Sequence, residues 1–336
     1  MTGNRPYPGH RPRFRSSVAR DPHVPAGHTA RLVHATLSPA IRATLALAPR
    51  FRPATSAAFH IGAYLGRRAP AYLGRLPSGS RIVLDLAEWA HRQIFFYGTY
   101  EEPTTAFLWR LSRPGWTFID IGANVGYFSL LAADLGGPAS TVVAFEPNPR
   151  LAGMLRESVR LSGHDARVSV IEAACSSISS TATLSLSPDP RNSGLSSFES
   201  FEPSVTASWE RPGAVVQVKT TRLDEWCASE DVVPDVVKVD VEGHELAVVE
   251  GMTGLFERGQ PQALICELSG DPRRPHAAAV LELLSTFDYR AFHIAGGGLQ
   301  PVASLDDVSD LENICFLAPQ GGGEGGVQPL GREAEK

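Results

Sequence analysis

The sequence predicts an α/β protein whose core is a mostly parallel sheet with helices on both faces. From Trp116 onward, short apolar runs alternate with amphipathic stretches, and this alternation is typical of repeated β-α-β units. Hydrophobic residues make up 43% and charged residues 20% of the 336 residues. The chain can therefore bury a large core, and it is not a disordered, collagenous or coiled-coil protein. No run of 18 apolar residues occurs, so no transmembrane helix is predicted.

The alternation predicts seven strands in one sheet, at 117–122, 141–147, 166–174, 234–243, 262–268, 289–295 and 312–318. Helices are expected between them, at 124–136, 149–161, 244–256 and 276–287. The segment between the last two strands has no long apolar periodicity, which predicts a reversed C-terminal hairpin. Two additional strands, at 181–187 and 214–223, flank an excursion rich in Ser and Pro.

The residues before Trp116 predict an N-terminal extension made of helices and a β-hairpin. Residues 38–68 have helical character with interruptions near Pro49 and Pro53, and residues 71–86 predict two short strands about a Pro-Ser-Gly turn. Helices follow at 87–98 and 104–113. We therefore expect four segments, which are a disordered basic arm (1–35), a helical and hairpin cap (36–115), the main domain (116–318) and a flexible tail (319–336).

Charge is distributed unevenly along the chain. Residues 1–80 contain twelve Arg and one acidic residue, Asp21, whereas the rest contains 19 basic and 35 acidic residues. A basic arm this short is interpreted as a solvated or partner-docking segment, and neither nucleic acid nor membrane is expected as a partner. The four cysteines form no CxxC pair, which argues against a disulfide framework and a zinc site. This cysteine usage and the lack of an apolar secretory segment favour a cytoplasmic location.

The most specific segment is Asp-Ile-Gly-Ala-Asn-Val-Gly, from Asp120 to Gly126. An apolar strand stops there and the chain must turn at once into a helix, so Gly122 and Gly126 allow the backbone to approach a ligand closely. One strand later, Glu146 ends an apolar run, in the position from which a carboxylate accepts hydrogen bonds from a ribose diol. A glycine turn followed by such an acid predicts a nucleoside-bearing cofactor at the carboxyl ends of parallel strands.

A second group, Lys238-Val-Asp-Val-Glu-Gly-His-Glu245, lies along and just after another apolar strand. Within a strand, Lys238, Asp240 and Glu242 would share one face, and such neighbours perturb each other's pKa values, which suits acid–base chemistry. Asp240 is expected to contact the reacting groups directly. His244 is the natural general base, because the ordinary pKa of histidine is about 6.5. The alternative for Glu242 and Glu245 is a structural role as acids at a helix N-terminus.

These two motifs resemble those of S-adenosylmethionine-dependent class I methyltransferases, whose fold is Rossmann-like, and within that class the chain resembles the FkbM family. The resemblance covers roughly residues 70–318 and excludes the extreme N-terminus and the glycine-rich tail. DIGANVG and KVDVEGHE together carry most of its specificity. The matching segments are YEEPTTAFLWRLSRPGWTFIDIGANVGYFSLLAA, AFEPNP, VIEAA, DVVKVDVEGHELAVVEG and ICEL.

The resemblance implies S-adenosylmethionine as cofactor and assigns its contacts. The methionine and ribose part would lie against Asp120, Gly122, Asn124, Gly126 and Asp240. Glu146 would bind the ribose hydroxyls, Asn148 would shape the adenine side, and Glu172 would lie near adenine unless it is an exposed acid at a strand end. Glu101, in the Tyr100-Glu-Glu-Pro box, would close over the methionine end.

The resemblance also points to residues at the acceptor side. The family's Asn-x-Gly-x-Ser-Ser stretch implies that Asn192 and Ser197 line the mouth of the site, unless this stretch is a plain surface loop. Glu245 is the third expected substrate contact. The catalytic set is Asp240, His244 and Glu242, and it includes no metal.

The function that these residues predict is O-methylation of a hydroxyl, and the resemblance implies a small-molecule acceptor, a secondary metabolite such as a polyketide or a sugar. One alternative is N-methylation, and a second is metal-assisted sugar O-methylation with oxygen ligands from Asp240, Glu267 and Asn313. A more remote alternative is a non-catalytic protein that binds adenosylmethionine. A nicotinamide-dependent oxidoreductase requires a different glycine turn, G-x-G-x-x-G, which is absent here.

Overall fold

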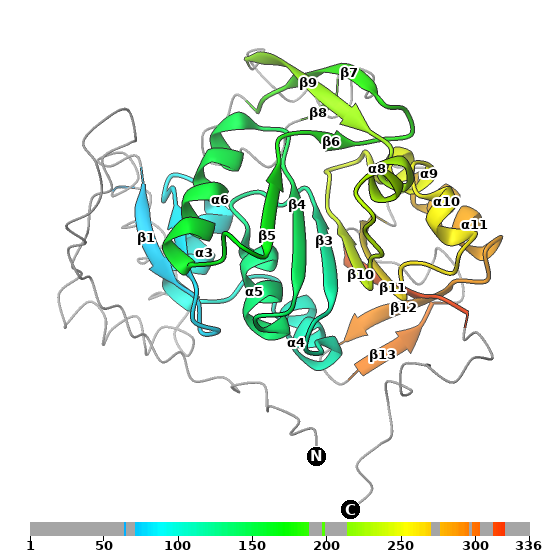
Figure 1. Cartoon of the computed structure of the whole chain (residues 1–336), viewed down its shortest axis with the longest axis horizontal. Helices are drawn as coiled ribbons and strands as arrows, with labels where there is room; N and C mark the ends of the chain where they lie inside the picture. The colour runs from blue at the N-terminus through cyan, green and yellow to red at the C-terminus, as the bar shows by residue number, and fades with distance from the viewer. Residues whose placement is uncertain are drawn as a thin grey trace, which may run out of the picture.

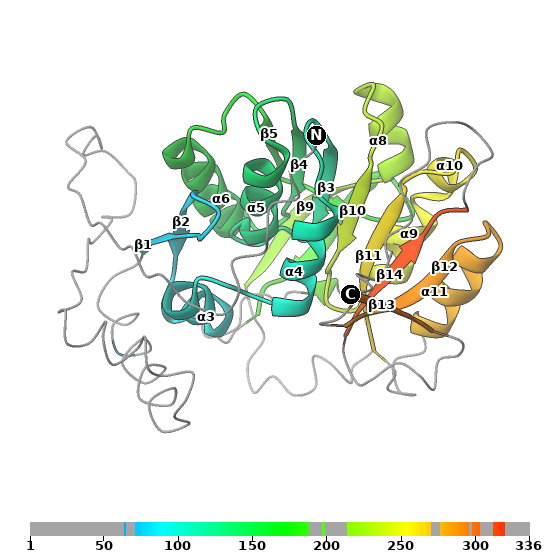
Figure 2. The same ribbon diagram turned by 90° about the horizontal axis from the view of Figure 1, so that it is seen from below.

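The computed structural model describes residues 64, 71–187, 197–198, 214–269, 276–295, 298–302 and 312–319. Its centre is a sheet of eight strands in the order β13-β12-β14-β11-β10-β3-β4-β5, with helices on both faces (Figures 1 and 2). These strands are β3 (Thr117–Ile121), β4 (Thr141–Phe145), β5 (Val168–Ile171), β10 (Val236–Val239), β11 (Ala263–Leu268), β12 (Arg290–Ala295), β13 (Gly298–Pro301) and β14 (Glu312–Leu317). The predicted arm at 1–35 and the tail beyond 319 lie outside the described residues.

The seven predicted strands are present, and the Rossmann-like α/β class is confirmed. Strands β11, β10, β3, β4 and β5 are parallel, whereas β14 and β12 run antiparallel to their neighbours and form the reversed C-terminal end. The predicted number of strands was one too low. A short eighth strand, β13, pairs with β12 at the edge of the sheet, where Pro301 is tolerated because an edge strand has one unpaired side.

Successive side chains of each central strand point to opposite faces of the sheet, and so build two core clusters. In β3, Phe118 packs in the cluster that contains α5 and α6, whereas Ile119 and Ile121 pack in the cluster that contains α8 to α11. The helices are α5 (Tyr127–Gly136), α6 (Pro149–Ser162), α8 (Leu223–Ser229), α9 (Glu245–Glu250), α10 (Thr253–Phe256) and α11 (His276–Ser285). Of the described helices, none is long and apolar enough to cross a membrane.

Two predicted elements differ from those observed. The single helix expected at 244–256 is broken between α9 and α10 at Gly251, where a Cβ atom would lie 2.1 Å from the Ser176 carbonyl oxygen. The strand expected at 166–174 leaves the main sheet after Ile171 and continues as β6 (Ala174–Cys175). In both places the chain changes direction to meet a segment that is distant in sequence.

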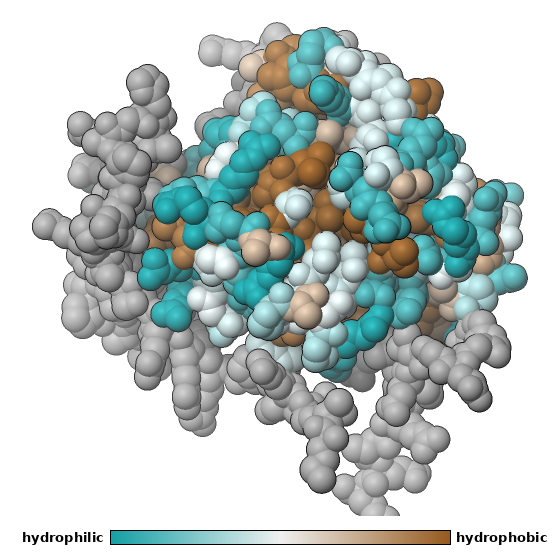
Figure 3. Space-filling view, in the orientation of Figure 1, coloured by the Kyte–Doolittle hydropathy of each residue, from teal (hydrophilic) through white to brown (hydrophobic). Residues whose placement is uncertain are grey.

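Strand β6 starts a second, four-stranded sheet with the order β6-β9-β7-β8. Its other strands are β7 (Ser180–Ser185), β8 (Ser197–Phe198) and β9 (Val215–Thr221). Because β6 follows the end of β5 directly, this small sheet lies beyond the carboxyl ends of the parallel strands, at the top of Figure 1. Figure 3 shows hydrophobic surface near the top of this face and in its middle. Val215 of β9 is an exposed hydrophobic residue of the small sheet.

The part of the N-terminal cap that the structure describes contains the predicted hairpin and two helices. These elements are β1 (Tyr72–Arg75), β2 (Arg81–Leu84), α3 (Trp89–Tyr97) and α4 (Glu102–Leu111). The hairpin is attached to α6, because the Val83 amide donates to Ser158 Oγ at 2.9 Å and the Arg81 amide donates to Ser162 Oγ at 2.9 Å. Helix α3 then follows the hairpin toward the carboxyl end of β3.

We expect Gly122→Ala to lower the free energy of unfolding by at least about 2 kcal/mol. Gly122 has φ +79, and a Cβ atom there would lie 1.8 Å from the Asp240 carbonyl oxygen. Urea denaturation provides the measurement. The matched control is Gly153→Ala in α6, where a Cβ atom meets nothing within 4 Å, so helix propensity should raise stability by about 0.5–1 kcal/mol. Equal stability of Gly122→Ala and the unchanged protein would contradict the close approach of these two segments.

Candidate active site

The turn after β3 brings two neighbouring strands together at their carboxyl ends. The amides of Gly122 and Ala123 both donate to the Phe145 carbonyl at 3.0 Å. Gly122, Asn124 and Gly126 have φ values of 79°, 52° and 86°, in the left-handed region that favours glycine and tolerates asparagine. The predicted glycine turn is therefore a compact loop, fixed to the end of β4, that opens into helix α5.

Glu146 lies directly after β4 and is 6% exposed. Its Oε2 accepts from the Asn124 amide and its Oε1 accepts from the Asn148 amide, both at 2.8 Å. Burial raises the pKa of the Glu146 carboxyl to about 7, although these two amides act to lower it. The carboxyl group is thus held in one orientation, and its remaining lone pairs are available to a ligand.

Lys238 lies at the centre of the sheet with acidic residues around it, and we call this group the charged hub. Its side chain is 1% exposed, and its ammonium nitrogen lies 2.7 Å from Asp240 Oδ2, 4.0 Å from Glu101 Oε2 and 4.6 Å from the centre of the Phe128 ring. Burial acts to lower the pKa of Lys238, but the carboxylates of Asp240, Glu101 and Asp120 outweigh it and raise the pKa above its usual value. Lys238 therefore stays charged and requires the acids around it.

Two of those acids accept further hydrogen bonds. Asp120, at 2% exposure, accepts from Ser129 Oγ at 2.5 Å, and burial raises its pKa. Glu101 precedes α4 with φ 41° and accepts from Asn313 Nδ2 at 2.8 Å. Burial raises the pKa of Glu101, and Lys238 opposes this shift.

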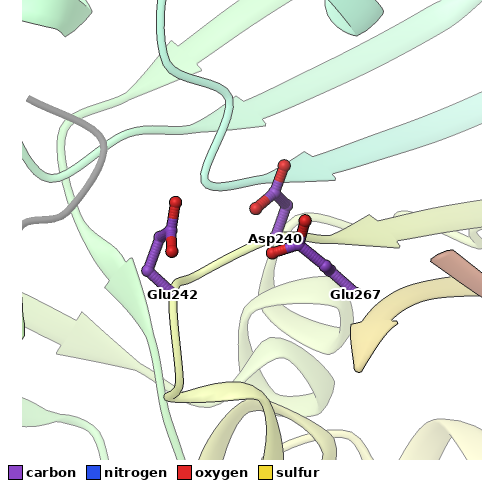
Figure 4. A group of neighbouring side chains, drawn as sticks. All are labelled: Asp240, Glu242 and Glu267. Atoms are coloured by element: carbon purple, nitrogen blue, oxygen red, sulfur yellow. The ribbon is translucent and has the colours of Figure 1, made fainter. Parts of the chain in front are cut away.

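Three carboxylates converge beside this hub, as Figure 4 shows. Asp240 and Glu242 come from the loop after β10 and Glu267 from the end of β11, and one oxygen of each lies within 4.8 Å of the others. Burial, followed by the charges of Asp240 and Glu242, raises the pKa of Glu267 to about 9. Close carboxylates of this kind either share protons or hold a divalent cation.

The residues expected to do acid–base chemistry are arranged differently from what the sequence predicts. Strand β10 ends at Val239 and Glu242 has φ 52°, so Lys238, Asp240 and Glu242 do not share one strand face as expected. His244 Nε2 lies 3.0 Å from Ser176 Oγ, and burial together with His276 lowers the pKa of His244 to about 4. At neutral pH the imidazole is uncharged and a weaker base than its ordinary pKa predicts, because a partly buried ring is costly to charge.

Two of the remaining predicted residues lie at the surface or have a local role. Glu172 is exposed and paired with Arg156 at 2.8 Å, as in the alternative of an acid at a strand end. Glu245 is buried at the start of α9 and its Oε1 accepts from the Gly243 amide at 2.8 Å, which is a structural contact. Ser197 belongs to β8, and Asn192 lies outside the described residues.

One pocket connects the glycine turn, Glu146 and the charged hub. The predicted residues in its lining are Asp120, Gly122, Asn124, Glu146, Asp240, Glu242 and His244. Lys238 belongs to the second predicted group but was given no role of its own, Glu88 and His91 were not predicted, and Glu267 was predicted only in the metal-assisted alternative. Nothing in the local pattern of α3 marks His91, because its partner in the turn is 33 positions away. Lys238 and Glu267 each lie one residue before the carboxyl end of neighbouring strands β10 and β11, a position that could have indicated them.

Comparisons with known proteins identify a matching family and a related sequence. The family described as Methyltransferase FkbM domain matches residues 120–291. The chain is 35% identical over 140 residues to the hexuronic acid methyltransferase AglP of Haloferax volcanii, and the match covers 41% of this chain and 50% of that protein. The chain thus spans about half the length of this curated relative.

Similar solved structures include a methyltransferase FkbM from Methylobacillus flagellatus KT, with a TM-score of 0.39 and 14% identity over 61% of this chain and 44% of that one. Another is an O-methyltransferase from Bacillus cereus in complex with SAH, with a TM-score of 0.33 and 14% identity over 60% of this chain and 73% of that one.

Proposed function

The chain belongs to the Methyltransferase FkbM family, and from this membership we propose that it is an S-adenosylmethionine-dependent O-methyltransferase. The acceptor is a hydroxyl of a small molecule, in the class of sugars or polyketides. The observation that carries the proposal is that a single pocket is lined by the glycine turn, by the buried Glu146 and by the Lys238–Asp240 pair. A site for a nucleoside and a charged reaction centre therefore adjoin each other.

The residues present fit adenosylmethionine by their chemistry. Glu146 uses both carboxylate oxygens to accept backbone amides, and its free lone pairs suit the two hydroxyls of a ribose. The turn from Gly122 to Gly126 gives the backbone access that the ribose and methionine parts need. At the other end, Asp240 and Glu101 supply negative charge for a cationic sulfonium.

The cofactor supplies an electrophilic methyl group, and the protein must align the acceptor hydroxyl with it. Alignment of two reacting groups contributes up to roughly 7–11 kcal/mol. Asp240 is the group that orients the hydroxyl and accepts its proton, and Lys238 Nζ, 2.7 Å from Asp240 Oδ2, holds this side chain in place. Glu267, whose pKa is about 9, is protonated at neutral pH and can donate a hydrogen bond to the acceptor.

O-methylation is favoured over N-methylation because a hydroxyl nucleophile gains from a base, and the pocket offers carboxylates for that role. The relative from Haloferax volcanii is a hexuronic acid methyltransferase, which supports a sugar or sugar-like acceptor. N-methylation stays an alternative, and methylation of matched hydroxyl and amino acceptors distinguishes the two. A protein that binds adenosylmethionine and transfers no methyl group to any acceptor would correspond to the non-catalytic alternative.

A second candidate is metal-assisted O-methylation. The observation that favours it is the convergence of Asp240, Glu242 and Glu267, whose oxygens lie within 4.8 Å of one another. Oxygen ligands of this kind suit Mg²⁺. Asn313, which the sequence assigned to this set, donates from Nδ2 to Glu101 at 2.8 Å, and this contact does not use its Oδ1.

Removal of metal separates these two candidates. For the metal-free reaction, we expect turnover after dialysis against EDTA to stay within about twofold of the untreated protein, because Asp240 supplies the base. Calorimetry of adenosylmethionine binding after the same dialysis is the control for intact structure. A loss greater than about tenfold that added Mg²⁺ restores would instead establish the metal-assisted reaction.

We expect Glu146→Gln to weaken adenosylmethionine binding by roughly 10- to 150-fold at pH 8, since hydrogen bonds to a charged group contribute about 1.5–3 kcal/mol. The pKa of Glu146 is about 7, and the carboxylate is the form that accepts from the ribose. Protonation below pH 7 therefore weakens binding, about tenfold between pH 8 and pH 6.

Isothermal calorimetry at several pH values measures this effect. The Glu146→Gln variant is also the control for the pH dependence. It keeps every other titrating group and loses only the contribution of Glu146. Its pH profile should be flatter than that of the unchanged protein. Unaltered affinity in Glu146→Gln would remove Glu146 from the cofactor site.

We expect Asp240→Asn to lower methyl transfer at least about 100-fold, while adenosylmethionine affinity falls by a much smaller factor, since Glu101 still supplies negative charge for the sulfonium. His244→Ala should reduce turnover less than Asp240→Asn does, because the lowered pKa of His244 makes it a weak base. Turnover is measured under conditions in which chemistry is rate-limiting. If His244→Ala falls as far as Asp240→Asn, His244 is the base, and if neither variant loses turnover, the group is structural.

A further inference from the structure

His91 of helix α3 lies against the glycine turn although it precedes residues 120–291, the segment that matches the family. Its side chain is buried, with 1% exposure, and it lines the pocket together with Glu88 of the same region. A polar ring at this depth requires hydrogen-bond partners on both nitrogens.

The partners of His91 define its protonation. The Asp85 amide donates to His91 Nδ1 at 3.1 Å, so Nδ1 carries no proton. Nε2 must then carry the hydrogen in the neutral ring, and it lies 3.1 Å from Asn124 Oδ1, an acceptor. Burial lowers the pKa of His91, which keeps the ring in this neutral, donating form.

Asn124 connects His91 to the centre of the turn through further hydrogen bonds. Its Oδ1 also accepts from the Val125 amide at 2.8 Å, and its own amide donates to Glu146 Oε2 at 2.8 Å. Asn124 has φ 52°, a conformation that is costly for most residues unless surrounding contacts hold it. The hydrogen bond from His91 therefore acts on the residue that orients Glu146.

The charges around His91 form a closed group. Arg150, at the start of α6, donates to Asp85 Oδ2 at 2.9 Å and to Glu88 Oε1 at 2.7 Å. Asp85 and Glu88 favour a charged His91, while Arg150 opposes it and burial dominates. This group ties the segment before α3 to the segment that follows Glu146.

We propose that His91 is a positioning residue of the cofactor site, which acts through Asn124 to hold the glycine turn and Glu146 in the geometry that binds the nucleoside part. The inference rests on the proposed function for the identity of the cofactor. It adds to that function a requirement for the N-terminal cap, because the donor comes from α3. The effect of losing His91 should appear in cofactor affinity, with little change in turnover at saturating cofactor.

The test compares three substitutions by calorimetry with adenosylmethionine. His91→Leu removes the donor and should raise the dissociation constant about tenfold, whereas His91→Gln keeps an amide donor and should stay within about threefold. The control is Phe96→Leu, a buried position on the same helix that does not line the pocket. This control should lower the melting temperature and leave affinity within twofold.

Amide hydrogen exchange of residues 122–126 gives a second measurement that needs no cofactor. We expect faster exchange in His91→Leu than in Phe96→Leu, because only the former frees Asn124. If His91→Leu does not fold, His91→Met removes the donor with a more adaptable side chain. Equal affinity and equal exchange in the unchanged protein and the apolar variant, or an equal loss in the Phe96 control, would overturn the proposal.

A double-mutant cycle with Asn124→Gly tests whether His91 acts through Asn124. Glycine retains the positive φ and deletes the acceptor Oδ1, so His91→Leu should cost less than about threefold in that background. Additive losses would overturn the proposed route. If the unchanged protein binds no adenosylmethionine, the proposed function fails together with this inference, whereas binding that is indifferent to His91 overturns the inference alone.

Discussion

The ammonium group of Lys238 is the constraint on which the rest of the site depends. It lies within the central sheet, where β10 pairs with Asp120 of β3 on one side and Ile265 of β11 on the other, and it is 1% exposed. A charge buried at this depth is costly unless it is paired on several sides. The pairing comes from Asp240, two residues later, from Glu101 before α4 and, at longer range, from Asp120. The position of Lys238 therefore dictates where negative charge gathers at the carboxyl end of the sheet.

The chemistry of the pocket follows from this unequal distribution of charge. Asp240 has Lys238 as a direct partner, whereas Glu267 faces Asp240 and Glu242 and has a pKa raised to about 9. Glu267 is thus protonated at neutral pH, because burial and the neighbouring anions disfavour its charged form, whereas Asp240 lies directly beside a cation. Such a pair can supply both a proton acceptor and a hydrogen-bond donor within one small volume. Histidine ordinarily has a pKa near neutral pH, but burial lowers the pKa of His244, which makes it a poor proton acceptor here.

The sequence predicted the parts of this molecule that local pattern determines. The glycine turn and Glu146 were identified because the chain must reverse within a few residues and only certain residue types allow it. The strand alternation similarly predicted the central sheet and its reversed end. The prediction failed where distant segments decide the outcome. The expected helix is broken at Gly251 because the Ser176 carbonyl lies against it. Glu172 forms an ion pair with Arg156 at the surface. Neither partner can be inferred from the pattern of the segment that it changes.

The same limit explains why the cap belongs to the site. The turn at 122–126 carries three left-handed residues at alternate positions, an arrangement that its own sequence permits and does not enforce. Its backbone is held from one side by the Phe145 carbonyl and by Glu146, both of which lie in the segment that matches the family. From the other side it is held by His91, which lies before that segment. Because Glu88, Ala90, His91, Ile94 and Tyr100 also line the pocket, part of its wall is built by residues outside the matched segment. A change in the cap can therefore alter both the rigidity of the turn and the shape of the space beside it, while the motif residues stay the same.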